Sequence, residues 1–288
     1  MKFATYQDGS RDGQLVVVSR DLSSAHYASG VAQNLRELLD DWNFLSPMAQ
    51  DLYETLNHGK ARHAFPFESA RCLAPLPRPP GFVQGRVLDG SEHQWTGGGE
   101  WRGACSRVPD ATQGVLEAGL AAVTADLPAA CGAPRAAEAL RLFMPVVHWR
   151  RESAPFDPEA QAVRAAYPLT LAGPVAVTPD EWGEAWSGST LAAAPACALQ
   201  CRINGRRWPE ARAAAGAEPR PFHWGRWVAR AAASQSLLAG TVVSAATLAL
   251  PVLAATDQVS LEWRAGELGG LLGALTPGAR AADQNSTS

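Results

Sequence analysis

Hydrophobic and polar residues alternate at the start of the chain and then change to a helical spacing. Residues 2–6 and 14–19 have the short alternating pattern of strands, and the stretch 8–13 between them is rich in turn residues. Between residues 31 and 41 the apolar positions recur every three or four residues, and a second stretch with this spacing covers 43–56. The opening of the chain therefore predicts a β-hairpin followed by two helices.

A proline-rich segment separates this opening from a longer, mostly β region. Its prolines are Pro75, Pro77, Pro79 and Pro80, and such a cluster is typical of a linker. Short helices are expected only near 136–141 and 226–233. The fold class is therefore α+β and β-rich, and the predicted parts are an N-terminal domain at 1–74, a linker at 75–80, a larger domain at 81–280 and a disordered tail at 281–288.

One strand of the larger region has an unusual polar pattern. Residues 114–124 form an apolar run in which Glu117 is the lone carboxylate. Because alternate residues of a strand face the same side, Glu117 and Gly119 share one face. A metal enzyme built on such a strand needs a second acid near Glu117, so the strand carries half of a possible site.

Composition and charge narrow the function classes. The 288 residues are 47% hydrophobic, enough for a sizeable core, and the net charge of −3 with a pI near 6.1 gives no basic surface for nucleic acid. No apolar run has the length of a membrane span and no signal-peptide pattern opens the sequence, so we expect a cytoplasmic protein without a membrane partner. The five cysteines, none in a CxxC pair, are expected to be reduced structural thiols: Cys72, Cys105, Cys131, Cys197 and Cys201.

Six short motifs, in this order, make the chain resemble bacterial proteins of the fumarylacetoacetate hydrolase family. They are KFATYQDGSRDGQL at 2–15, DWNFL at 41–45, RHAFPF at 62–67, GPVAVTPDE at 173–181, QCRINGR at 200–206 and FHWG at 222–225. The resemblance implies a small N-terminal domain followed by a mixed β-sandwich roll, in a protein that is usually a homodimer. It also implies a Mg²⁺ or Ca²⁺ ion held by carboxylates, which polarises a 1,3-diketo substrate while a His–Glu pair activates water for C–C cleavage.

The residues that carry this chemistry in the family are largely replaced here. The paired acids fall on Glu117 and Gly119, and a later aspartate falls on His148. The family's arginine falls on Glu152, its lysine on Tyr167, and its Gly-Thr-Val-Ser loop on residues 246–249. Since a hard cation needs several oxygen ligands, we expect no metal and no other cofactor.

The resulting hypothesis is a metal-independent enzyme that acts on a small β-dicarbonyl-like or polar metabolite. Glu117 and His148 are the expected catalytic pair for proton transfer, as in tautomerisation, cyclisation, dehydration or decarboxylation. The residues expected to contact the substrate are Tyr167, Thr247, Arg150, Arg151 and His93.

Three other interpretations stay open at this point. Glu117 and His148 can be a structural pair that fills the former metal site. The chain can be an inactive paralogue that binds a small molecule or an active family member. A hydrolase with a rebuilt metal site, such as zinc on Glu117, His148 and His93, is the third.

Overall fold

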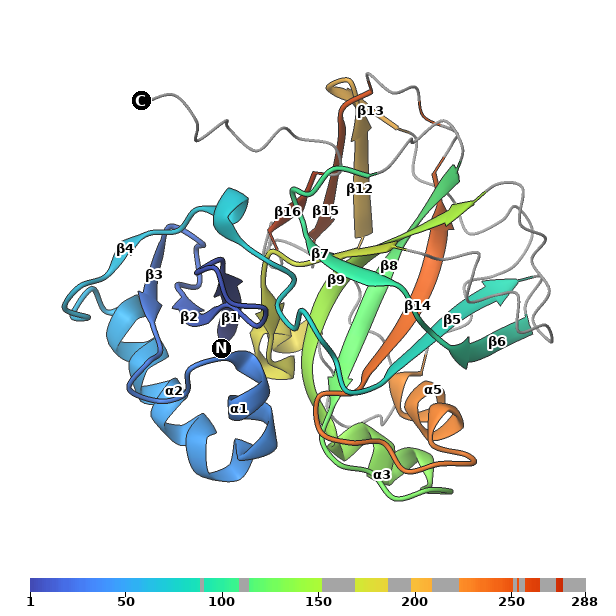
Figure 1. Cartoon of the computed structure of the whole chain (residues 1–288), viewed down its shortest axis with the longest axis horizontal. Coiled ribbons are helices and arrows are strands. Elements are labelled where there is room, and N and C mark those ends of the chain that lie inside the picture. Colours follow the sequence, from blue (N-terminus) through green and yellow to red (C-terminus); the bar gives the residue numbers. More distant parts are fainter. Residues whose placement is uncertain are drawn as a thin grey trace.

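The first part of the chain forms a hairpin-based sheet covered by two helices (Figure 1). The computed structural model describes residues 1–88, 91–108, 114–151, 169–185, 198–208, 223–250, 253, 257–264 and 273–276. The elements of this first part are β1 (Lys2–Tyr6), β2 (Gln14–Val18), β3 (Ser24–Tyr27), α1 (Leu35–Asp40), α2 (Trp42–Asn57), β4 (Phe65–Pro66) and η1 (Ser69–Arg71).

Local signals in the sequence explain where these helices begin and what they cover. The side chain of Asn34 accepts a hydrogen bond from the backbone N–H of Glu37 and caps α1. The apolar face of α2 buries Leu45, Ala49 and Tyr53 against β2 and β3. Both expected strands and both expected helices are present, so this part of the prediction is confirmed.

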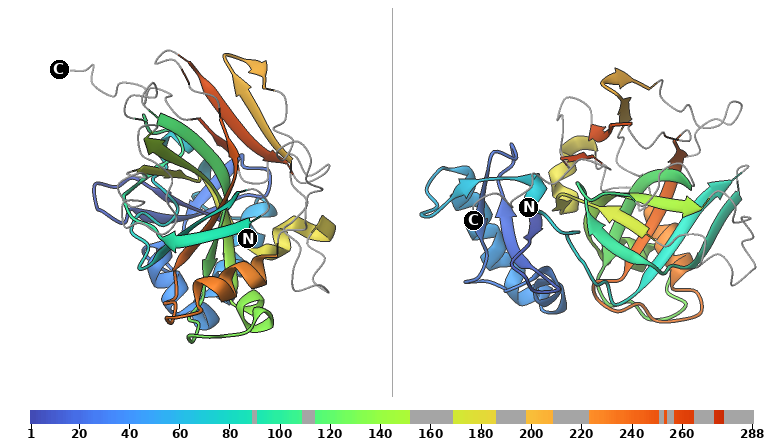
Figure 2. Two further views of the ribbon diagram at one scale, coloured as in Figure 1. Left: turned by 90° about the vertical axis from the view of Figure 1, so that its right-hand side faces the viewer. Right: turned by 45° about the horizontal axis from the view of Figure 1, so that its top comes forward.

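The larger part is built on long antiparallel strands that curl into a roll (Figure 2). Its strands are β5 (Phe82–Leu88), β6 (Ser91–Thr96), β7 (Glu100–Gly103), β8 (Gly114–Thr124), β9 (Leu140–Arg151), β10 (Leu169–Ala172), β11 (Ala176–Val177) and β14 (Val242–Ala249). Strand β9 pairs with β8 on one side and with both β10 and β11 on the other. Because β11 also pairs with β1, the hairpin of the N-terminal part belongs to the same twelve-stranded sheet of the described chain.

Within the described residues, two helices and a 3₁₀ segment accompany the roll. They are α3 (Ala133–Glu138), α5 (Trp224–Ala231) and η3 (Pro179–Ala185). The helix expected near 136–141 ends earlier than predicted, because β9 begins at Leu140. Trp227 of α5 donates its indole N–H to the backbone oxygen of Ser244, at 3.0 Å, and so fixes α5 to β14. None of the helices in the described ranges is long and apolar enough to cross a membrane.

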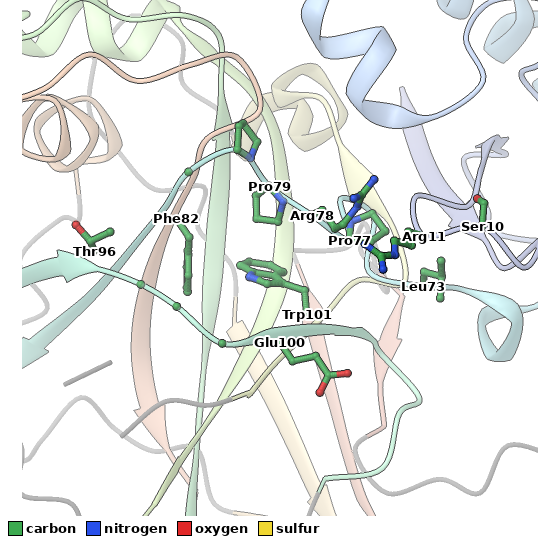
Figure 3. Close-up of a pocket in the computed structure, with 15 residues that line it drawn as sticks. Ser10, Arg11, Leu73, Pro77, Arg78, Pro79, Phe82, Thr96, Glu100 and Trp101 are labelled. Carbon is green, nitrogen blue, oxygen red and sulfur yellow. The ribbon is translucent and has the colours of Figure 1, made fainter. Parts of the chain in front are cut away.

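The proline-rich segment runs between the two parts and borders a pocket (Figure 3). Arg78 of this segment is hydrogen-bonded to the carboxylate of Asp12, at the turn between β1 and β2. The linker is therefore attached to the N-terminal hairpin rather than free in solution.

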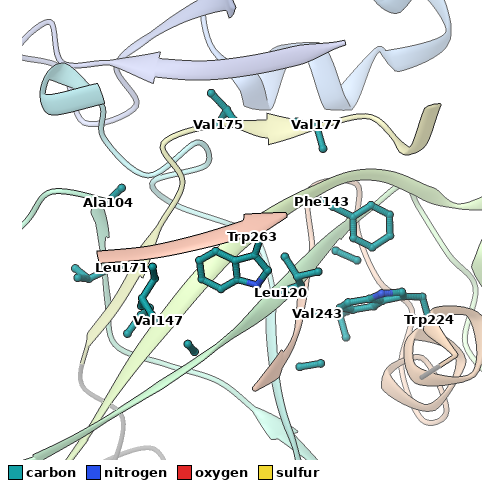
Figure 4. Packing of buried hydrophobic residues seen from close by; sticks show 14 of the residues in the cluster. Ala104, Leu120, Phe143, Val147, Leu171, Val175, Val177, Trp224, Val243 and Trp263 are labelled. Atoms are coloured by element: carbon teal, nitrogen blue, oxygen red, sulfur yellow. The ribbon is translucent and has the colours of Figure 1, made fainter. Parts of the chain in front are cut away.

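A second, smaller sheet packs on one face of the roll. It consists of β12 (Ala198–Ile203), β13 (Arg206–Arg207), β15 (Val259–Arg264) and β16 (Ala274–Leu275). Trp263 of this sheet belongs to the same buried cluster as Leu120 of β8 and Val147 of β9 (Figure 4). The opposite faces of β8 and β9 contribute Ala121 and Met144 to a second cluster, which continues into the N-terminal part. These elements confirm a β-rich α+β fold.

Candidate functional site

The register between β8 and β9 places the predicted catalytic residues directly opposite each other. Glu117 is the Cα partner of His148 in this antiparallel pair, and His148 is in turn the partner of Thr170 on β10. Directly paired residues have their side chains on the same face of a sheet. Arg150, two residues after His148, shares this face as well.

Glu117 forms a buried ion pair with Arg150. The guanidinium Nε donates to Oε1 of Glu117 at 2.9 Å, and the side chains are 2% and 15% exposed. A guanidinium keeps its positive charge and offers several N–H donors in a fixed plane. The cation beside the surviving carboxylate is therefore a side chain of the protein itself.

His148 lies between two hydroxyl groups in the interior of the sheet. Its Nδ1 contacts Oγ1 of Thr170 at 2.9 Å, and its Nε2 contacts Oγ of Ser244 at 3.1 Å. The imidazole is fully buried, and this burial lowers its pKa to about 3. At neutral pH the ring is uncharged, so His148 supplies hydrogen bonds here rather than a positive charge.

His148 and Ser244 belong to strands on opposite sides of β8. Ser244 lies on β14 and pairs with Ala121, whereas His148 pairs with Glu117 from the other side of β8. Gly119 lies between these two positions of β8, on the same face, and adds no side chain there.

The other predicted contact residues are described only in part. The backbone of Arg151, at the end of β9, pairs with Gly114 of β8. The backbone of His93, in β6, pairs with Arg86 of β5. Thr247 lies at an irregularity of β14, between the paired residues on either side of it. The side chains of these three residues, and all of Tyr167 and Glu152, lie outside the described part, so their roles stay predictions.

Sequence reasoning missed three polar residues on this face. Thr170 and Ser244 contact His148, and both are buried. Gln84 of β5 is 1% exposed, and its amide has no hydrogen-bond partner within the described residues. Thr170 is the lone polar residue of β10, the same signal that singled out Glu117, so this signal could have found it. The strands of Gln84 and Ser244 carry a second polar residue each, Arg86 and Thr247, and do not show this signal.

Comparisons with known proteins agree with this architecture. Residues 1–78 match the family model described as fumarylacetoacetase N-terminal domain 2. This match covers 78 of the chain's 288 residues. The resemblance noted in the sequence is thereby confirmed. No curated protein matches the chain in sequence.

Several solved structures share the fold over almost the whole chain. Maleylpyruvate hydrolase from Sphingobium sp. SYK-6, in complex with manganese(II) and pyruvate, has a TM-score of 0.69 at 15% identity, covering 96% of this chain and 98% of that one. Fumarylacetoacetate hydrolase from Exiguobacterium antarcticum has a TM-score of 0.64 at 16% identity, with coverages of 96% and 98%. A probable 2-hydroxyhepta-2,4-diene-1,7-dioate isomerase from Mycobacterium abscessus has a TM-score of 0.68 at 16% identity, with coverages of 96% and 97%. At these identities the likeness shows the fold.

The described residues do not fit the divalent cation that the fumarylacetoacetate hydrolase family implies. They contain no group of three or more His, Cys, Asp or Glu side chains that could hold a metal ion. Glu117 already faces a guanidinium, and both nitrogens of His148 contact hydroxyl groups. Hard cations need several oxygen ligands in one shell, and this part of the chain offers one paired carboxylate. The described surroundings of Glu117 therefore do not form a divalent-cation site.

Proposed function

We propose that this member of the fumarylacetoacetate hydrolase family is a metal-independent enzyme that transfers protons on a small β-dicarbonyl-like or otherwise polar anionic metabolite. The observation that carries the proposal is the buried Glu117–Arg150 pair. It supplies a proton acceptor and a fixed positive charge side by side, on the face that the family uses for its cation.

Each member of the pair suits one half of such a reaction. The carboxylate of Glu117 can take a proton from the carbon next to a carbonyl group and return it to another atom of the same substrate. The guanidinium of Arg150 stays protonated and does not act as an acid, but its N–H groups can stabilise the enolate oxygen that forms. Tautomerisation is the simplest reaction of this kind, because it consumes and releases nothing else.

His148 has a different part in this proposal from the one expected of a base. A neutral imidazole with a pKa near 3 is a weak proton acceptor, and its two nitrogens already contact Thr170 and Ser244. We assign it to positioning: it occupies the space beside Glu117 and ties β9 to β10 and β14. The Glu117–His148 catalytic pair stays a prediction with less support than Glu117–Arg150.

The test is hydrogen–deuterium exchange, followed by NMR in D₂O with EDTA present. It is measured at the carbon next to the ketone of small 2-oxo acids and at the carbon between the carbonyl groups of 1,3-dicarbonyl acids. The wild type is expected to accelerate exchange for at least one acid, and Glu117→Gln to abolish the acceleration. The control is Arg36→Gln, which removes an exposed pair with Asp40. Exchange that needs an added divalent cation, or that survives Glu117→Gln, contradicts the proposal.

One observation favours a second function, that of a binding protein without turnover. In the unliganded chain, both nitrogens of His148 contact hydroxyl groups and Glu117 is paired with Arg150. Such internal contacts are typical of structural groups. Such a protein binds a small anion through Arg150 without exchanging its protons. Saturable binding that Arg150→Met removes, without accelerated exchange for any acid, supports this alternative. A homodimer, expected from the family, is tested by the mass measured in light scattering.

A further inference from the structure

The pocket beside the linker is separate from the Glu117–Arg150 pair and has a composition of its own. Its volume is about 620 Å³, within the range of sites for small molecules. Three segments form its walls: the turn between β1 and β2, the linker, and the glycine-rich turn 97–99 that leads into β7. Figure 3 shows the indole of Trp101 in the middle of this pocket, with Phe82 on one side and the linker on the other.

The walls of the pocket are held in place by contacts in the unliganded chain. Arg78 is bound to Asp12 through two hydrogen bonds, one of 2.8 Å, which join the linker to the hairpin turn. Pro77, Pro79 and Pro80 restrict the backbone on both sides of Arg78. A site formed before the ligand arrives costs less conformational entropy on binding.

Aromatic rings form one wall of the pocket. The rings of Phe82 and Trp101 meet edge to face, with centroids 4.9 Å apart. Gly97 allows this arrangement, because a Cβ there would lie 2.1 Å from the ring of Phe82. The wall offers an apolar, flat surface for a planar ligand.

The charges at the edge of the pocket favour an anion. Arg78 is paired with Asp12, and Glu100 is paired with Arg102. Arg11, on the hairpin turn beside Asp12, adds a further positive charge to the lining. A small acid can place its flat apolar part on Trp101 and its carboxylate near Arg11 and Arg78.

We propose that this pocket is a second binding site, which takes a planar organic anion such as an aryl carboxylate or a conjugated carboxylate. The proposal does not rest on the proposed function. Behind the pocket, the ring of Phe82 lies 5.8 Å from that of His148. Phe82 therefore both lines the pocket and neighbours the imidazole of His148.

The binding experiment uses trans-cinnamate, a planar carboxylate, with the full-length chain and saturation-transfer NMR. For a ligand of this size we expect a Kd on the order of 1 mM. The blocking variant is Gly98→Leu, because a Cβ at Gly98 meets no atom within 4 Å and the new side chain can fill the pocket without straining the fold. The matched control is Gly30→Leu, where an added Cβ is equally free but lies outside the pocket.

The expected results separate this site from the interior pair. Gly98→Leu raises the Kd at least about tenfold and Arg11→Glu raises it several-fold, while Gly30→Leu and Glu117→Gln leave it unchanged. The melting temperature of Gly98→Leu stays at the wild-type value. The proposal is overturned if cinnamate does not bind up to about 10 mM, if binding survives Gly98→Leu, or if Glu117→Gln abolishes it.

Discussion

Replacing Arg150 by methionine tests whether Glu117 and Arg150 stabilise the fold as a pair. The variant keeps most of the apolar stem of the side chain but leaves the carboxylate of Glu117, which is 2% exposed, without its guanidinium. Removing one partner of a buried pair costs about 3–5 kcal/mol, and the 15% exposure of Arg150 reduces this to about 2–4 kcal/mol. For a chain of 288 residues the loss corresponds to a fall in melting temperature of roughly 3–7 °C.

The double variant Glu117→Gln/Arg150→Met supplies the decisive comparison. It removes both charges, so we expect it to be more stable than Arg150→Met and within about 1 kcal/mol of the wild type. Stability is measured by urea unfolding, followed by circular dichroism and by tryptophan fluorescence. Arg36→Met, at an exposed pair, is the control and should cost no more than about 0.5 kcal/mol. The pair does not act as a unit if Arg150→Met lowers the free energy of unfolding by less than about 1 kcal/mol. The same conclusion follows if the effects of Glu117→Gln and Arg150→Met on this free energy simply add in the double variant.

Three further predictions concern the packing around this site. The pKa of His148 is lower in the folded chain, about 3, than in the unfolded chain, so its contribution to stability is complete above about pH 6.5 and is lost as the pH falls toward 3; urea midpoints between pH 7 and 4 should fall less steeply for His148→Asn. Gly119→Val adds a side chain on the face of β8 between the partners of His148 and Ser244, and the ring ¹⁵N shifts of His148 in NMR should change; unchanged shifts would show that position 119 does not adjoin the imidazole. Gly85→Ala sets a Cβ 2.0 Å from the ring of Trp227 and should destabilise the chain by about 1–3 kcal/mol in thermal unfolding, whereas Gly30→Ala, with no atom near, should be close to neutral.

The strand that carries Glu117 could be predicted because its signal is local. Alternation along residues 114–124 places Glu117 and Gly119 on one face, and β8 has these same bounds. The N-terminal hairpin and helices were predictable for the same reason, since turn residues and apolar spacing act over a few positions. The two short helices lie two or three residues earlier than predicted, at 133–138 and 224–231. The first of them ends before 141 because a strand of the sheet begins at Leu140.

The contacts of the site could not be predicted in this way, because they join distant segments. Arg150 is 33 residues from Glu117, and Ser244 is 96 residues from His148. Nothing in the local sequence of β14 indicates that it lies beside β8, so Ser244 was not a candidate. The resemblance to the family indicated that the strands of Glu117 and His148 are neighbours, and the register confirms that proximity.

The sequence by itself determined that Glu117 is the lone carboxylate of residues 114–124 and that Gly119, on the same face, offers no ligand. That His148 replaces an acid is what the resemblance to the fumarylacetoacetate hydrolase family implies. Only the tertiary structure decided which partners Glu117 and His148 have, because hydrogen bonding and burial depend on which strands lie side by side. In that structure Glu117 is paired with the guanidinium of Arg150, and the neutral imidazole of His148 lies between the hydroxyl groups of Thr170 and Ser244.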